Sequence, residues 1–246
     1  MSPRTRFLVV SLATMLMVAL TAALGLWQLD RAAQKTALQD SLRARGQLPP
    51  WSTAELLAAP DPAQGLHRPV RLQGRWIAER TLFLDNRQMN AQVGFFVVTP
   101  LRLSGSDRVV LVQRGWVPRD FQDRSRVPTV PTPEGEQLIE GRLVPPPGRL
   151  LQFAEAGTGP IRQNIDPLAF GAETGLPLLN LSVQQTGDSD NTLRRDWPQP
   201  VTDVAKHHGY AFQWFALCAL LAGLYLWFQI LQPWRARARS HGPDAR

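Results

Sequence analysis

Two adjacent histidines, His207 and His208, stand at the start of an uncharged apolar stretch that continues to Ile230. Polar side chains at membrane depth are costly and are usually retained for a task. Neighbouring residues on a helix point about 100° apart, so these two imidazoles cannot easily chelate one ion. One neutral imidazole is nevertheless sufficient to ligate haem iron when apolar and aromatic side chains pack on the macrocycle.

Helical spacing places the two histidines on different faces. The residues that follow on the face of His207 lie three, four, seven and eleven positions later, and they are Tyr210, Ala211, Trp214 and Cys218. In this interpretation Ala211 leaves room for a flat ligand that Tyr210 and Trp214 border. The alternative is a belt of aromatic residues and histidine at a membrane surface with no ligand, and spacing alone favours that alternative.

Two other kinds of site lack the residues that they need. Hydrolase catalysis requires a histidine beside a serine or cysteine nucleophile, but His67 is the only histidine of the central segment and no G-x-S-x-G motif accompanies it. We interpret His67 as a surface loop residue. The single cysteine, Cys218, rules out an intramolecular disulfide and metal motifs built on cysteine pairs.

Arginines recur near the ends of the expected strands, several of them beside tryptophan or asparagine. A guanidinium group binds carboxylates in a bidentate manner, so such residues suit an acidic ligand or partner. For any single arginine a solvated surface position with its stem on apolar neighbours is the more frequent alternative. The residues concerned are Arg75, Arg80, Arg87, Arg114, Arg119 and Arg124.

Two apolar blocks, residues 7–27 and 207–230, are long enough to span a bilayer as helices. The first exceeds the apolar core of a signal peptide, which favours a retained anchor. Cytoplasmic loops carry excess arginine and lysine near the membrane. Arg4 and Arg6 precede the first block, and three further arginines follow the second: Arg235, Arg237 and Arg239. Both termini are therefore predicted to be cytoplasmic.

This topology divides the chain into five segments: a cytoplasmic N-terminus of residues 1–6, a span of residues 7–27, an extracytoplasmic domain of residues 28–206, a span of residues 207–230 and a basic cytoplasmic tail of residues 231–246. Trp27 and Gln28 would then lie level with His207. Most of the formal net charge of +7 comes from arginines beside the spans, whereas the domain mixes both signs. A nucleic-acid-binding domain would carry a concentrated basic patch, so no nucleic-acid partner is expected.

The domain is predicted to be rich in β-structure. Residues 29–46 continue the first span as a helix, because no breaker precedes Gly46. From Pro69 apolar and polar residues alternate, as in a half-buried strand. Further strands are expected over residues 81–84, 92–101, 108–116, 137–144, 161–165 and 178–186, with a turn at Asp85–Asn86 and short helices at 55–59 and 167–173. The fold class is two transmembrane helices flanking a mostly antiparallel barrel or sandwich with minor helix.

Four segments, in order along the chain, carry a resemblance to a known family. They read LGLWQLDRAAQK, LDNRQMNAQVGFFVVTPL, VLVQRGWVPRD and HHGYAFQWFAL. Together they resemble the Surf1 family of cytochrome c oxidase assembly factors, known as Shy1 in yeast. The resemblance extends from about residue 24 to residue 228 and includes both predicted spans.

The resemblance implies a non-enzymatic protein of the bacterial inner membrane that binds haem a and aids its insertion into oxidase subunit I. His207 occupies the position of the family's proposed iron ligand. Ala205 and His208 depart from the pattern, which has an asparagine and an apolar residue there. Combined with the helical spacing and the topology, it gives a haem site in which His207, or alternatively His208, ligates iron, Tyr210 and Trp214 line the slot, and Trp27 and Gln28 close it from the first span. Contacts to propionates or to a partner are assigned, with less support, to Arg31, Arg87, Arg114 and Trp116.

Two rival functions remain open. The first is a scaffold without cofactor, which holds oxidase subunit I or haem a synthase. The second is an enzyme with an exported β-domain, for which no catalytic constellation is present in the sequence.

Overall fold

The computed structural model describes residues 2–120, 122–123, 126–150, 159–187, 192–198 and 203–235. The chain forms two compact units. The helical unit combines both ends of the chain, Met1–Asp40 and Pro200–Arg246, and the β unit is Ser41–Gln199. Arg124 and the tail beyond residue 235, including Arg237 and Arg239, lie outside the described residues.

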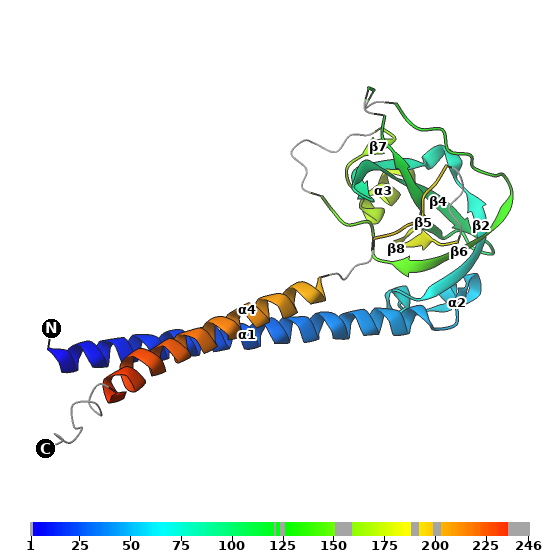
Figure 1. The fold of residues 1–246 in the computed structure, drawn as a ribbon. Coiled ribbons are helices and arrows are strands. Elements are labelled where there is room, and N and C mark those ends of the chain that lie inside the picture. The colour runs from blue at the N-terminus through cyan, green and yellow to red at the C-terminus, as the bar shows by residue number, and fades with distance from the viewer. Residues whose placement is uncertain are drawn as a thin grey trace, which may run out of the picture. The chain divides into compact units, whose positions relative to one another are not determined.

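The helical unit consists of two long helices that run side by side (Figure 1). Helix α1 is continuous over Pro3–Gly46, which confirms the predicted helical extension of the first apolar block. Helix α4 spans Val204–Tyr225 and continues as the π-helical turn η3, Leu226–Leu231. Both helices are long and apolar enough to cross a membrane, judged by length and composition. Arg43 and Arg45 in the last turn of α1 complement the partial negative charge of the helix C-terminus.

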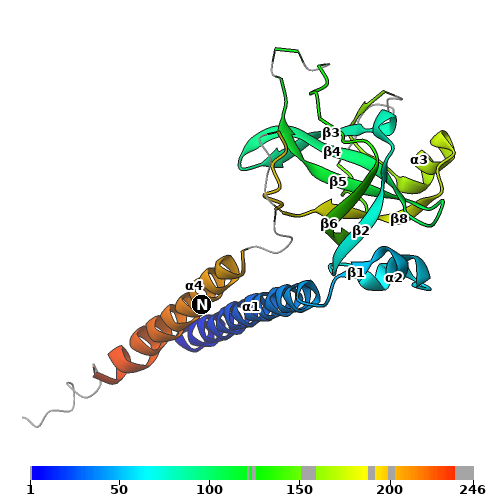
Figure 2. The same ribbon diagram turned by 90° about the vertical axis from the view of Figure 1, so that its right-hand side faces the viewer.

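The β unit is built on one sheet of eight strands, which Figures 1 and 2 show from two sides. The strands are β1 (Trp51–Ser52), β2 (Pro69–Trp76), β3 (Leu82–Met89), β4 (Gln92–Leu103), β5 (Val109–Pro118), β6 (Glu136–Val144), β7 (Ile161–Arg162) and β8 (Leu178–Gln185). Short helical elements are α2 (Thr53–Ala58), η1 (Pro62–Gly65), η2 (Ala78–Arg80) and α3 (Pro167–Thr174).

The sheet closes into a barrel. Strand order is β1-β2-β6-β8-β5-β4-β3-β7, and an additional pairing of β2 with β4 completes a ring through β2, β6, β8, β5 and β4. This decides between the barrel and the sandwich. Five pairings are antiparallel and three are parallel, namely β1–β2, β3–β7 and β5–β8. The sheet is therefore mostly antiparallel, as predicted.

Strand β5 is the most deeply buried element of the barrel. Val109 to Val112 are each 0% exposed, because alternate side chains enter different apolar clusters. Val110 and Val112 pack with residues of β2, β6 and β8, whereas Leu111 packs with Phe170 of α3. Helix α3 therefore covers the outward side of β5, and the uninterrupted apolar run reflects burial of both strand faces.

Both predicted short helices are present, and local capping explains where they begin. Ser52 and Glu55 form a reciprocal capping box at the start of α2. Asp166 accepts hydrogen bonds from two backbone amides at the start of α3, and Pro167 occupies its first turn. Gly175 ends α3 with a φ of 72°.

The predicted turn at Asp85–Asn86 is wrong. Strand β3 continues through these residues to Met89, with a bulge where the β3–β4 register shifts between Leu84 and Arg87. Asn86 takes the left-handed conformation there, with a φ of 59°. The chain reverses later, at Asn90–Ala91, where both φ angles are positive, as a tight hairpin turn requires. The strand expected over residues 161–165 is also shorter, because β7 is only Ile161–Arg162.

Candidate functional site

The two helices of the helical unit are joined by a polar contact near each end. The Ser11 hydroxyl lies 2.7 Å from the Tyr225 hydroxyl. At the other end, Oε1 of Gln28 lies 2.7 Å from Nδ1 of His207. Between them, the Cys218 thiol lies 3.6 Å from a backbone carbonyl oxygen of α1. Residues with higher numbers on α1 contact residues with lower numbers on α4, so the two helices are antiparallel.

Small residues allow the helices to approach closely. A Cβ atom placed on Gly25 would lie 2.7 Å from Cζ of Phe215. Ala211 is only 2% exposed, so the space beside it is filled in the folded chain. Its role as room for a flat ligand is therefore not supported, and close helix packing accounts for its size. Small residues at the interface and polar side chains across it are typical of paired membrane helices.

Replacing Gly25 by leucine is expected to disrupt this packing. Overpacking usually costs about 1–3 kcal/mol, which corresponds to roughly a 5- to 150-fold shift in the helix-pairing equilibrium. The yield of a short bismaleimide cross-link between Cys218 and a cysteine introduced at Val18 would report the change. Gly223→Leu is the matched control, because nothing lies within 4 Å of a Cβ atom at Gly223. Equal yields in the two variants would contradict the described crossing.

The structure brings together some of the predicted site residues of the helical unit and separates others. His207 and Trp214 are half-buried, and His207 contacts Gln28. Tyr210 is 51% exposed and Trp27 is 50% exposed, and His208 is also exposed. Of the residues predicted to share one face of α4, four are buried or half-buried: His207, Ala211, Trp214 and Cys218. Tyr210 is the exposed member of that face.

Arg31 and its neighbours on α1 form a separate local network. The Arg31 guanidinium donates to Oε1 of Gln34 and lies 5.7 Å from the centre of the Trp27 ring. The Gln34 amide donates in turn to the Asp30 carboxylate. Arg31 therefore packs on Trp27. Trp27 directly precedes Gln28, the residue that contacts His207.

The contact with Gln28 determines which ring nitrogen of His207 is available as a ligand atom. An amide oxygen only accepts hydrogen bonds, so an imidazole facing Oε1 of Gln28 donates from Nδ1, and the neutral form of that tautomer keeps its lone pair on Nε2. Among the residues that the structure describes, Nε2 has no hydrogen-bond partner. Metal-ligating histidines commonly donate their other ring N–H to an oxygen in this way. The donor set thus fits one axial ligand of haem iron.

Arg87 and Arg114 belong to the β unit and are buried there. Arg87, 7% exposed, donates to the carbonyl oxygens of Gly148 and Gln163. Burial lowers the pKa of its guanidinium. Arg114, 6% exposed, donates to the Thr132 hydroxyl and to the carbonyl oxygen of Pro131. Its guanidinium lies 5.0 Å from the centre of the Trp76 ring. These contacts favour a structural role over contact with propionates.

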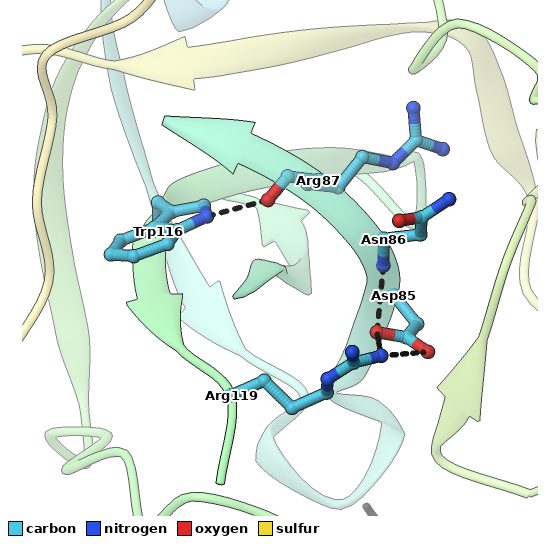
Figure 3. Close-up of polar contacts among 5 residues, drawn as sticks. All are labelled: Asp85, Asn86, Arg87, Trp116 and Arg119. Carbon is cyan, nitrogen blue, oxygen red and sulfur yellow. Dashed lines mark hydrogen bonds and ion pairs between the residues drawn. The ribbon is translucent and has the colours of Figure 1, made fainter. Parts of the chain in front are cut away.

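Trp116 connects two of the segments that carry the family resemblance (Figure 3). Its side chain is fully buried, and its indole N–H donates to the carbonyl oxygen of Arg87 over 2.9 Å. In the same region Arg119 donates to the Asp85 carboxylate, which also accepts from the backbone N–H of Asn86. The bulged middle of β3 is thereby joined to β5 and to the residue that follows it, Arg119. Spacing along the chain gave no signal for the Arg119–Asp85 pair.

The described part of the β unit also contains a polar cleft of about 530 Å³ that sequence reasoning missed. Trp76, Arg114, Arg195 and a proline-rich loop line it. His67, predicted to be a surface loop residue, is half-buried instead. Burial and then the charges of Arg142 and Arg45 lower the pKa of its imidazole.

Comparison with known proteins supports the resemblance. The chain is 28% identical over 244 residues to the SURF1-like protein of Drosophila melanogaster, covering 87% of this chain and 75% of the relative. It is 27% identical over 235 residues to the SURF1-like protein of Rickettsia conorii, covering 91% and 90%. Cytochrome oxidase assembly protein SHY1 of Saccharomyces cerevisiae is 28% identical over 137 residues, covering 54% and 35%.

The family match spans both units of the structure. Residues 15–219 match the sequence model of the SURF1 family, and they include the helix pair around Gln28 and His207 as well as the barrel. The chain therefore belongs to the SURF1 family.

Proposed function

We propose that the protein is a membrane-anchored, non-enzymatic assembly factor for cytochrome c oxidase, which binds haem a through His207 and aids its insertion into subunit I. Family membership and the oxidase-assembly name of its yeast relative support the assembly role. The single observation that carries the haem proposal is the Gln28–His207 contact, which leaves one imidazole nitrogen available at the mouth of an apolar helix pair.

The membrane location is supported by the side chains that the helix pair exposes. Leu12, Leu16 and Phe212 are 70%, 68% and 74% exposed. Water would make such a surface prone to aggregation, whereas lipid tails would cover it. Arg4, Arg6 and Arg235 flank the apolar stretches, which supports cytoplasmic termini and an extracytoplasmic barrel in the bacterial inner membrane.

The residues around His207 would hold haem a in complementary ways. Haem a, when bound, supplies the iron that Nε2 of His207 ligates. Tyr210 and Trp27 have aromatic surface to offer a flat apolar ligand, since each is about half exposed. Holding haem a through one protein ligand would permit its release, which delivery to subunit I would require. Arg31, which packs on Trp27, would offer its guanidinium to a propionate.

Removing His207 is expected to abolish most haem a uptake. Full-length protein would be purified from a host that makes haem a, and bound haem would be quantified from its absorption spectrum. His207→Ala should lose the signal, and the neighbouring control His208→Ala should retain it. Loss in His208→Ala alone would make His208 the ligand. Full haem content in both variants would refute ligation by either histidine.

One observation favours a scaffold without cofactor as the second candidate. Ala211, beside which a flat ligand was expected to fit, is only 2% exposed, so helix packing already fills that space. A scaffold would hold subunit I or haem a synthase irrespective of haem. Co-purification of either partner that survives loss of both histidines, together with a haem-free wild-type protein, would establish this function instead.

A further inference from the structure

We infer that Gln28 is a positioning residue for His207: its amide oxygen accepts the Nδ1–H hydrogen bond, fixes the imidazole tautomer and thereby presents Nε2 as the ligand atom. This inference rests on the proposed haem function. In this inference the first span does more than anchor the protein, because it also orients the imidazole of His207.

The contact joins two residues 179 positions apart, and both come from regular helices. At 2.7 Å it is a short, well-formed hydrogen bond. Gln28 follows Gly25 by three positions, and Ala211 follows His207 by four, so the contact lies one turn from the close helix crossing. Packing at that crossing therefore limits movement of both side chains.

The same contact distinguishes the two adjacent histidines. His207 is half-buried and held by Gln28, whereas His208 is exposed and has no hydrogen-bond partner among the described residues. An unrestrained imidazole exchanges between two tautomers and many orientations. A restrained one presents a single nitrogen, which lowers the entropy lost when it ligates a metal. Of the pair, His207 is therefore the prepared ligand.

The neighbouring polar residues of α1 are engaged elsewhere. Gln34 binds Asp30 and Arg31 on the outer side of the helix. Gln28 is thus the residue of α1 whose side chain bridges to α4 at this end of the pair, just as Ser11 does at the other end.

A first test needs no haem. In full-length protein labelled with ¹⁵N-histidine and held in detergent micelles, the two ring nitrogens of His207 differ in chemical shift according to which one bears hydrogen. We expect the Nδ1–H tautomer in the wild type and a mixture in Gln28→Leu. Gln213→Leu is the matched control, because it makes the same change at an exposed site on α4. An Nε2–H tautomer in the wild type, as a rotated amide would give, overturns the inference.

A second test uses haem a itself. Losing an outer partner of a metal ligand typically costs about 10- to 100-fold in metal affinity, so Gln28→Leu should weaken haem a binding by that factor. It should also shift the iron–imidazole stretching vibration. Gln28→Glu should restore binding, because a carboxylate accepts the same Nδ1–H bond more strongly. Gln213→Leu should bind like the wild type.

The outcomes separate this inference from the function on which it rests. A wild-type protein that takes up no haem a overturns the proposed function, whatever the tautomer. Binding that depends on His207 but is unchanged in affinity and vibration by Gln28→Leu overturns the role of Gln28 alone. An unchanged tautomer in Gln28→Leu does the same.

Discussion

Replacing Trp116 by alanine is expected to destabilise the β unit strongly. Truncating a fully buried tryptophan costs about 3–5 kcal/mol, and the side chain of Trp116 is 0% exposed. The change also removes the indole donor to the Arg87 carbonyl and the ring on which Arg194 stacks. Since domains are typically stable by about 5–15 kcal/mol, much of the folding free energy would be lost.

A graded series would test the cause. Trp116→Phe keeps most of the packing but lacks the N–H group, so it should cost less than Trp116→Ala. Trp234→Ala removes a tryptophan that is 67% exposed and should leave the β unit unchanged. Denaturant unfolding of the full-length protein in detergent, followed by circular dichroism, gives the free energies. A cost below about 1 kcal/mol for Trp116→Ala would contradict the described burial.

Replacing Gly94 by alanine is expected to have a comparably large effect. A Cβ atom at Gly94 would lie 2.1 Å from the carbonyl oxygen of Val117 and 2.6 Å from the Trp116 indole. The nearer atom belongs to the backbone of a paired strand and cannot rotate away, so β4 and β5 must separate locally. We expect a loss at or above the usual range of about 1–3 kcal/mol for overpacking.

Gly148→Ala is the matched control for this change, because nothing lies within 4 Å of a Cβ atom at Gly148. The same unfolding experiment applies. Combining Gly94→Ala with Trp116→Phe should not restore stability, since the closest obstacle is the backbone oxygen of Val117. Rescue by the double variant would show that the indole, and not the strand backbone, limits the space at Gly94.

The elements with strong local signals could be predicted from the sequence. The long apolar blocks and the breaker-free segment up to Gly46 predicted α1, and alternation from Pro69 predicted β2. Barrel closure could not be predicted in the same way. It depends on pairings between distant segments, including the β2–β4 contact and the parallel β5–β8 pair, which leave no periodic signal in either strand.

Asp85 and Asn86 show why local turn chemistry can mislead. Both residues favour turns because they tolerate left-handed conformations and bind nearby backbone. In the fold the same properties serve a bulge inside β3, with Asp85 fixed by Arg119 from the end of β5. Only the tertiary partner distinguishes the two uses, and that partner is 34 positions away.

The candidate site was predicted in part for a similar reason. Helical spacing groups His207 with Trp214, and both are half-buried; the expected level of the first span places Gln28 near His207, and the two side chains are in contact. Spacing could not say which side of that stripe faces α1, and Tyr210, expected to border a ligand beside His207, is 51% exposed. Arg87 and Arg114 were assigned to propionates or a partner because a guanidinium suits a carboxylate; their partners within the fold, Gln163 and Thr132, lie on loops that no local pattern links to them.

The two polar contacts that join α1 and α4 are separated by a distance that can be compared with the thickness of a bilayer. Ser11 and Gln28 are separated by roughly 17 residues of continuous helix, or about 25 Å along its axis. The hydrocarbon layer of a typical bilayer is about 30 Å thick. In the proposed membrane location, a thicker bilayer would draw one or both contacts into lipid tails, whereas a thinner one would leave both at its surfaces. Hydrophobic thickness would then act directly on the hydrogen bond that orients His207, which makes the helix pair sensitive to the lipid composition around it.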